Sequence, residues 1–152
     1  MIIIKNGNLF DSECQTLVNT VNCDGIMGAG IAKQFKQKYP KMFEDYKLAC
    51  KPGIYRCLEH GGDLWLYTYI DLFKEKKILC FATKEHWQYP SKLEWIEHGL
   101  KEFVADYKYW KITSVAWPKL GCNNGGLNWE NEVKPLMIKY LDDIDIINEI
   151  YE

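Results

Sequence analysis

Short apolar runs alternate along the chain with segments of helical periodicity, and this alternation predicts an α/β fold. The apolar runs predict strands over residues 1–5, 16–22, 54–58, 64–70, 77–83, 112–117 and 144–151. Apolar side chains that recur every three or four positions predict helices over residues 30–39, 41–50, 91–107 and 131–141. Several of the strands are apolar throughout, so both of their faces need cover. We therefore expect one domain, residues 1–152, built as a three-layer α/β/α sandwich around a mixed β-sheet.

Turn and cap residues indicate how some of these elements begin and connect. Ser91 is expected to cap the helix that follows it. Asp11 and Ser12 are candidate caps for a short helical piece before the second strand. A turn with two adjacent glycines predicts a hairpin between segments 54–58 and 64–70.

Composition narrows the class of protein. The chain is 47% apolar and 26% charged, as is typical of a soluble globular domain. No apolar run reaches the length of a membrane span, and the N-terminal segment is too short for a signal peptide. We therefore expect a cytoplasmic protein with no membrane partner. The formal net charge of −2 argues against broad electrostatic wrapping of nucleic acid.

The six cysteines could indicate disulfides or a metal site. They lie at positions 14, 23, 50, 57, 80 and 122, without a C-x-x-C pair or the Cys/His spacing of a zinc site. We therefore expect buried, reduced thiols and no bound metal. Cys23 and Cys122 lie in or beside glycine-rich loops, but no histidine is near Cys122 in sequence to raise its thiolate fraction. A nucleophilic role for Cys122 is accordingly disfavoured.

The segment with the most chemical character is a buried run that leads into a glycine-rich turn and then a helix. Asn19 and Asn22 interrupt the run, and the turn continues with Gly28, Ala29, Gly30 and Ile31. Glycines let the backbone approach a phosphate, and the first N–H groups of a helix have no internal partner. The segment predicts an anion cradle, and the alternative is an ordinary strand-to-helix turn. Its spacing is neither that of a P-loop nor that of the usual dinucleotide fingerprint.

A second loop rich in glycine and asparagine lies further along the chain. It also follows a predicted strand and precedes a predicted helix. Its residues are Gly121, Cys122, Asn123, Asn124, Gly125, Gly126 and Leu127. Open α/β sheets bind ligands beyond the carboxyl ends of their strands. Two such loops can therefore close on one diphosphate from opposite sides.

The motifs of both loops resemble those of macrodomains, the ADP-ribose-binding α/β/α modules. The resemblance runs nearly end to end, through segments 7–9, 18–22, 28–32, 83–84 and 118–127. Within that family the chain is most similar to the DarG-type branch. Those domains remove ADP-ribose from thymidine bases in DNA and so counteract the DarT toxin. The most specific pieces of the resemblance are segments 81–87 and 125–129.

The resemblance implies an ADP-ribosyl glycohydrolase that reverses DarT-type modification of DNA without a metal or another cofactor. The two loops would hold the diphosphate through backbone N–H groups. Asn22 would contact the distal ribose, and Asn8 and Leu9 would lie at the adenine end. Asn19 and Thr83 belong to the same motifs and are also expected to bind ADP-ribose.

A lysine that matches Lys84 is the catalytic residue in the hydrolytic relatives. Lys84 follows a buried apolar strand and lies close to Trp87 in sequence, so its ammonium group can be desolvated. A neutral amine could attack the anomeric carbon of the distal ribose, whereas a charged one could stabilise the developing charge. Without the resemblance, a surface lysine just past a strand end would be the simpler interpretation.

One position departs from the pattern of the lysine-dependent relatives. Some of them carry an acidic residue where this chain has Asn128, and a carboxamide cannot abstract a proton. Either Lys84 acts without that partner, or Glu130 or His86 assists it, or turnover is weak and the domain mainly binds.

Other functions fit the same residues. A non-catalytic ADP-ribose reader would keep both loops and tolerate the loss of Lys84. A hydrolase of ADP-ribose 1″-phosphate, O-acyl-ADP-ribose or protein-linked ADP-ribose would use the same pocket. A cluster of lysines favours single-stranded DNA as the substrate, although a solvated helix face explains it about as well: Lys33, Lys36, Lys38 and Lys41. A DarT-like toxin is a candidate partner, and the chain ends before the C-terminal region that DarG antitoxins carry.

Overall fold

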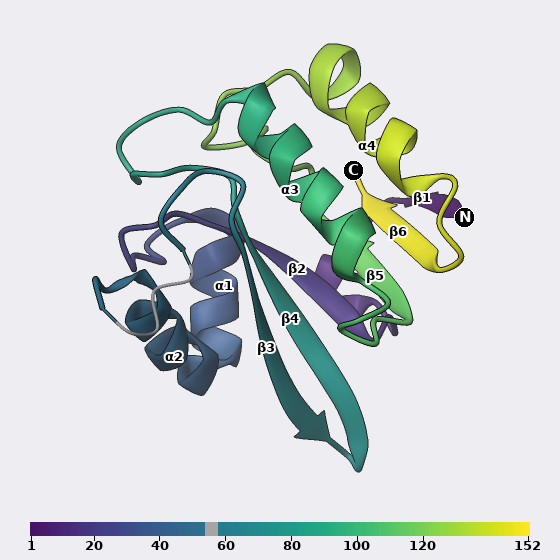
Figure 1. The fold of residues 1–152 in the computed structure, drawn as a ribbon. Helices are drawn as coiled ribbons and strands as arrows, with labels where there is room; N and C mark the ends of the chain where they lie inside the picture. Colours follow the sequence, from purple (N-terminus) through teal and green to yellow (C-terminus); the bar gives the residue numbers. More distant parts are fainter. Residues whose placement is uncertain (54–57) are drawn as a thin grey trace.

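Parallel strand pairing organises the structure, a computed structural model that describes residues 1–53 and 58–152 (Figure 1). One sheet has the strand order β1-β6-β5-β2-β4-β3. The strands are β1 (Ile2–Lys5), β2 (Thr16–Val21), β3 (Leu64–Asp71), β4 (Lys74–Ala82), β5 (Ser114–Trp117) and β6 (Ile147–Tyr151). All neighbours pair in parallel except β3, which pairs antiparallel with β4. The mixed sheet predicted from the sequence is therefore confirmed.

Helices cover both faces of this sheet (Figure 1). One face is covered by α1 (Gly30–Lys38) and α2 (Pro40–Cys50), and the other by α3 (Leu93–Asp106) and α4 (Lys134–Leu141). Two short pieces complete the chain, a 3₁₀ helix η1 (Leu9–Asp11) and a π-helical turn η2 (Trp129–Val133). The three layers confirm the predicted sandwich. Among the described residues, no helix combines the length and apolar character that crossing a membrane requires.

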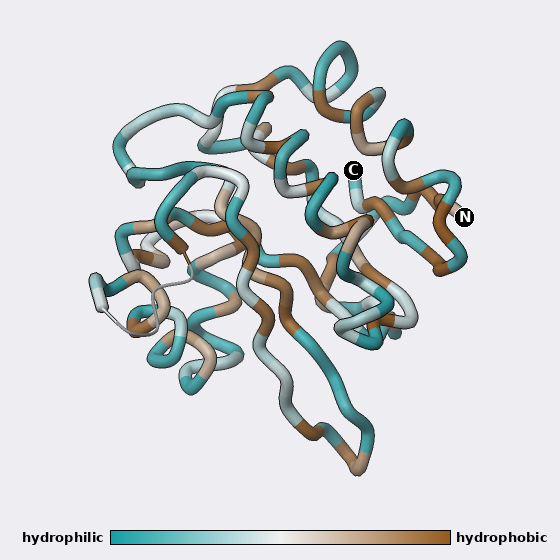
Figure 2. The backbone as a smooth tube through the Cα atoms, viewed as in Figure 1, coloured by the Kyte–Doolittle hydropathy of each residue, from teal (hydrophilic) through white to brown (hydrophobic). Residues whose placement is uncertain are grey.

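The central strands are buried on both faces, which explains their continuous apolar runs. In β4, Ile78 and Cys80 belong to the core under α1 and α2, whereas Leu79 and Phe81 belong to the core under α3 and α4. Successive side chains of a strand point to opposite faces, so each layer receives every second residue. Figure 2 shows the same contrast, with hydrophobic residues near the helices and hydrophilic ones along the far part of β4.

The structure contains a hairpin, formed by β3 and β4, that the sequence did not predict. The strand expected over 54–58 lies almost entirely outside the described residues, so the hairpin predicted between 54–58 and 64–70 stays a prediction. Leu72 and Phe73 connect β3 to β4, with φ angles of 48° and 67°. Two successive positive φ angles are typical of a type I′ turn, which normally carries Asn or Gly. Because Leu-Phe is not a turn sequence, the sequence contains no signal for this hairpin.

The first short helix begins with a different side-chain cap from those predicted, and Ser12 holds its C-cap position through a backbone hydrogen bond. Asn8 is the N-cap of η1, because its Oδ1 accepts a hydrogen bond from the N–H of Phe10 at 3.0 Å. Asp11 ends this helix and Ser12 follows it, with its hydroxyl 2.6 Å from a carboxylate oxygen of Glu149. The hydroxyl of Ser12 therefore contacts a residue distant in sequence instead of capping the neighbouring helix.

Ser91 is not a cap. Lys92 holds the N-cap position of α3, and the N–H of Ser91 donates to the carbonyl of Gly125 at 2.9 Å. The helix expected over 131–141 begins earlier, because η2 precedes α4 without a break. Both differences arise where this part of the chain folds against the second glycine-rich loop.

Glu149 on β6 connects this strand to the edge strand β1. Its carboxylate lies 2.8 Å from the Nζ of Lys5 and accepts hydrogen bonds from Ser12 at 2.6 Å and Tyr151 at 3.0 Å. Desolvation by itself would raise the pKa of Glu149, but the hydrogen bonds from Lys5, Ser12 and Tyr151 outweigh it and lower the pKa to about 2. A lowered pKa contributes stability above the ordinary value of 4.5 that is lost as the pH falls towards 2.

Glu149→Gln should reduce the free energy of unfolding near neutral pH by about 1–3 kcal/mol, because it removes a charge-assisted network. The loss should shrink as the pH falls from 4.5 towards 2, because the wild-type carboxylate then becomes protonated too. Urea unfolding followed by circular dichroism across that range measures both effects. A constant difference between the two proteins at every pH would contradict this account.

Substitutions in the turn between β3 and β4 should make the protein more stable. Replacing Leu72→Asn together with Phe73→Gly should raise the free energy of unfolding by about 1–2 kcal/mol, because these residues tolerate positive φ. The control is Phe73→Ala, which removes the fully exposed ring but keeps a Cβ at the same φ. Equal stability of the double variant and the control in urea titrations would show that the turn is not strained.

Candidate active site

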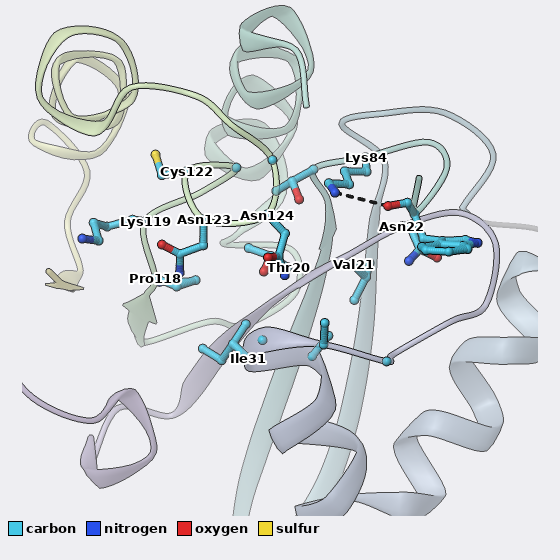
Figure 3. Close-up of a pocket in the computed structure, with 18 of the residues that line it drawn as sticks. Thr20, Val21, Asn22, Ile31, Lys84, Pro118, Lys119, Cys122, Asn123 and Asn124 are labelled. Carbon is cyan, nitrogen blue, oxygen red and sulfur yellow. Dashed lines mark hydrogen bonds between the residues drawn. The ribbon is translucent and has the colours of Figure 1, made fainter. Parts of the chain in front are cut away.

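Three loops meet at one edge of the sheet because the strands that precede them are neighbours. Strands β4, β2 and β5 are adjacent and parallel, so their carboxyl ends lie together, as the sequence predicted. The loops surround a cavity of about 570 Å³, a volume typical of small-molecule sites (Figure 3). Its lining residues are Thr20, Val21, Asn22, Ile26, Gly28, Ala29, Gly30, Ile31, Ala32, Thr83, Lys84, Trp87, Pro118, Lys119, Gly121, Cys122, Asn123, Asn124 and Gly125.

The N-terminus of α1 faces this cavity. Ala29 is its N-cap and makes no side-chain capping bond, and the first residues of the helix, Gly30 to Ala32, line the cavity. N–H groups in a first helical turn lack intrahelical partners, and the helix dipole favours an anion there. Gly30 has a φ of 58°, and a Cβ built on it would lie 3.2 Å from the Nδ2 of Asn124. The two glycine-rich loops therefore approach each other at this point.

Backbone hydrogen bonds within the second loop, and to Ser91 just before α3, hold this loop in place. The N–H of Leu127 donates to the carbonyl of Gly121 at 3.0 Å, and the carbonyl of Gly125 accepts from Ser91. A Cβ built on Gly125 would overlap the Gly121 carbonyl and the Ser91 hydroxyl. Only glycine at this position lets the backbone of the loop approach Gly121 and Ser91 so closely. The backbone of the loop therefore lies at the cavity wall.

Asn22 organises the first loop from within. Its Nδ2 donates to the carbonyl of Ile26 at 2.9 Å, and its Oδ1 accepts from the N–H of Asp24 at 3.0 Å. The buried hydroxyl of Tyr46 on α2 donates to the carbonyl of Asn22 at 2.7 Å. Asn22 lines the cavity as expected, but its carboxamide already holds the loop in shape. Its contact with a ribose stays a prediction.

Lys84 lies on the cavity wall and is held from two sides. The N–H groups of Thr83 and Lys84 both donate to the carbonyl of Val21, at 3.0 and 3.4 Å, so the β2–β4 contact continues past the strand ends. The Nζ of Lys84 donates to the carbonyl of Trp87 at 3.3 Å, marked by the dashed line in Figure 3. The side chain is partly buried. The amine is therefore positioned beside the cavity.

Asp24, which the sequence did not single out, joins the first loop to the segment after β4. Its Oδ1 lies 3.0 Å from the Nδ1 of His86, and its Oδ2 accepts from the N–H of Trp87 at 2.9 Å. His86 is exposed and lies outside the lining of the main cavity. Its assistance to Lys84 stays a prediction. The partners of Asp24 are 62 and 63 residues away in sequence, so no local sequence pattern predicts this contact.

Three residues of the early motifs lie outside the cavity lining. Asn8 caps η1, and Leu9 is buried in the core under α1 and α2. Asn19 is fully buried, with its Nδ2 3.7 Å from the sulfur of Met27. All three side chains thus make contacts within the protein, and their predicted contacts with ADP-ribose stay predictions.

Four residues of the late motifs also lie outside the lining. Asn128 caps η2, because its Oδ1 accepts from the N–H of Asn131 at 2.8 Å. Glu130 is exposed in the first turn of η2, Gly126 is exposed, and Leu127 packs on the core under α3 and α4. Neither of the residues expected to assist Lys84 from this side reaches the cavity wall.

Sequence reasoning missed several lining positions. Thr20 and Ile26 lie beside the predicted asparagines, and Pro118 and Lys119 lie directly after β5. Pro118 and Lys119 could have been predicted from their position immediately after a parallel strand, because open α/β sheets present ligand-binding residues there.

Two lysines of the four-residue cluster make contacts away from the cavity. The Nζ of Lys36 lies 4.5 Å from the ring centroid of Phe43, and that of Lys38 lies 5.1 Å from the ring centroid of Phe10. Both lysines are in the last turn of α1, at the opposite end from the cavity. Cations in a last turn are favoured by the helix dipole, so these residues have a structural role.

Burial acts on the two thiols near the cavity. It raises the pKa of Cys23 to about 12 and that of Cys122 to about 11. The raised pKa favours the protonated thiol over the thiolate in both residues. Over residues 1–53 and 58–152, no three His, Cys, Asp or Glu side chains are grouped so that they could hold a metal ion.

Comparison with known proteins decides the family. The family model of the Macro domain matches residues 18–136, a range that contains both loops and Lys84. The chain belongs to the macrodomain family. This macrodomain is 42% identical over 149 residues, 97% of its chain, to a Mycobacterium tuberculosis protein named DNA ADP-ribosyl glycohydrolase. It is 37% identical over 145 residues, 95% of its chain, to a Thermus aquaticus protein of the same name. It spans 41% and 39% of the length of these two relatives.

Solved structures are similar over the whole macrodomain. The macrodomain of Mycobacterium tuberculosis DarG matches with a TM-score of 0.90 and 41% identity, covering 99% of this chain and 97% of that one. The structure of Thermosipho africanus DarTG in complex with ADP-ribose matches with a TM-score of 0.91 and 35% identity. That match covers 99% of this chain and 41% of the other.

The close approach at Gly125 gives a direct test of the second loop. Gly125→Ala should lower the free energy of unfolding by about 1–3 kcal/mol, because the added methyl group meets backbone that cannot move away freely. Gly28→Ala is the matched control, since its Cβ would meet only a side-chain carbon of Ile26, at 3.7 Å. Urea titration of both variants measures the difference. Equal stability of the two would show that the loop is loosely packed.

Proposed function

We propose that this macrodomain binds ADP-ribose between its two glycine-rich loops and hydrolyses the bond between ADP-ribose and a thymidine base in single-stranded DNA. Lys84 is the required side chain, and no metal or other cofactor takes part. The observation that carries the proposal is the placement of the Lys84 amine on the wall of the cavity that the N-terminus of α1 faces. Residues 1–152 act as one macrodomain in this proposal.

The diphosphate is the group that the two loops suit. The first turn of α1 offers N–H groups and the positive end of the helix dipole. Asn124 and the backbone at Gly125 close the same space from the other loop. Among the described residues that line the cavity there is no Asp or Glu, so no carboxylate opposes the phosphates. The solved Thermosipho africanus DarTG complex with ADP-ribose supports this ligand.

Hydrolysis breaks the bond between the anomeric carbon of the distal ribose and the base nitrogen. The electron pair leaves with the base, which takes up a proton, and the anomeric carbon ends with a hydroxyl group from water. Lys84 either attacks that carbon as a neutral amine, to be displaced by water, or remains charged and stabilises the departing base. Reduction that traps a covalent adduct on Lys84 would distinguish the first role from the second.

The names of the relatives support the substrate and the partner. A Thermosipho africanus relative is 38% identical over 160 residues, 97% of this chain, and is named a DNA ADP-ribosyl transferase-DNA ADP-ribosyl glycohydrolase fusion protein. We infer that this macrodomain reverses the product of a DarT-like transferase. A DNA substrate also places it in the cytoplasm.

A non-catalytic reader of ADP-ribose is the second candidate. Asn128 and Glu130 lie outside the cavity lining, and no described lining residue is a carboxylate that could activate water. A reader would bind ADP-ribose equally well with or without Lys84. A glycohydrolase would require Lys84 for the release of ADP-ribose from the substrate but not for the binding of ADP-ribose.

Lys84→Ala should reduce release of ADP-ribose from ADP-ribosylated single-stranded DNA by at least about a hundredfold, the loss typical of a group that acts on the reacting atoms. Its affinity for free ADP-ribose, measured by calorimetry, should change little. The matched control is Lys108→Ala, a lysine whose side chain is 72% exposed and paired with Asp145, which should behave as wild type. Tight binding with no release by any of the three proteins would exclude the glycohydrolase and favour the reader.

A further inference from the structure

Two large aromatic side chains lie exposed beside the candidate active site. Trp87 is 52% exposed and Tyr89 is 61% exposed, both on the segment that follows β4. Such side chains normally gain stability by burial, so their exposure next to a cavity calls for a surface function. Core packing does not account for them, because neither belongs to the two buried clusters.

Their segment is held in place by specific contacts. The carboxylate of Asp24 binds the N–H of Trp87 at 2.9 Å and the ring of His86 at 3.0 Å. The N–H of Tyr89 donates to the carbonyl of His86 at 3.2 Å, and the Nζ of Lys84 donates to the carbonyl of Trp87 at 3.3 Å. The rings are therefore presented on an ordered backbone.

The aromatic segment borders a second hollow that continues the first. This hollow has a volume of about 440 Å³ and is lined by Asp24, Ile26, His86, Trp87, Gln88 and Tyr89. Ile26 and Trp87 line the main cavity as well. Because the Nζ of Lys84 is hydrogen-bonded to the carbonyl of Trp87, this hollow adjoins the part of the main cavity where Lys84 lies.

The charged side chains that line the hollow determine which ligands it can bind. Asp24 is a lining carboxylate, and no lysine or arginine lines the hollow among the described residues, so a phosphate would be repelled there. Flat, uncharged groups suit Trp87 and Tyr89, because aromatic rings stack on any nucleobase. An unpaired base of the substrate strand has these properties, and its phosphates can remain in solvent.

We propose that Trp87 and Tyr89 form a stacking platform for an unpaired nucleobase next to the bond that is cleaved. The platform determines specificity for a single strand over free ADP-ribose. It rests on the proposed function in its choice of a DNA substrate, but base stacking can be measured without any turnover.

The first test is binding of an unmodified, fluorescein-labelled oligothymidine by fluorescence anisotropy. Trp87→Ala and Tyr89→Ala should each weaken binding by about five- to a hundredfold, the range for loss of one base–aromatic stack. Trp87→Phe, which keeps an aromatic ring, should retain most of the affinity. Tyr109→Ala is the matched control, because Tyr109 is 85% exposed and lies outside both hollows.

Two further measurements separate this proposal from the proposed function. Affinity for free ADP-ribose should be unchanged in Tyr89→Ala, because Tyr89 lies outside the lining of the main cavity. Where the wild type releases ADP-ribose, Trp87→Ala should raise KM for the modified oligonucleotide far more than for the modified mononucleotide. Binding of oligothymidine that depends on Trp87, without any release, would support the platform and refute the glycohydrolase. No binding by the wild type, or equal binding by wild type and both alanine variants, would overturn the platform and point to a protein partner for these rings.

Discussion

Strand β2 lies between β4 and β5 and pairs in parallel with both, and the whole site depends on this pairing. It brings three strand ends to one edge, so loops that are far apart in sequence surround one cavity. The pairing continues beyond the strands, because the carbonyl of Val21 accepts from the N–H groups of both Thr83 and Lys84. The backbone of Lys84 thus has a fixed position relative to the first loop.

The cavity combines a favourable site for an anion with an amine, and the described lining contains no carboxylate. Backbone N–H groups at the start of α1 can bind a diphosphate without an added cation. The carboxylate of Asp24, which lines the neighbouring hollow, connects two loops through hydrogen bonds. In our proposal, this separation of charge lets one end of the site bind phosphates and the adjoining hollow bind an uncharged base.

The sequence was sufficient for the features that depend on periodicity and on strand ends. The three layers, the two glycine-rich loops and the position of Lys84 after a buried strand all follow from local patterns. Features that depend on contacts distant in sequence were missed. Leu72 and Phe73 form a turn without turn residues, and Asp24 finds partners on another loop. Asn128 could be read as a site residue, although its side chain caps a helix.

We propose that ADP-ribose binds between the first turn of α1 and the second loop, with Lys84 at the reacting end. Titration of ¹⁵N-labelled protein with ADP-ribose, followed by the amide signals, shows where the ligand binds. We expect the largest shifts on residues 28–32, 84 and 121–125, while strands β1 and β6 stay unchanged. Large shifts confined to other parts of the chain, or none at saturating ligand, would contradict it.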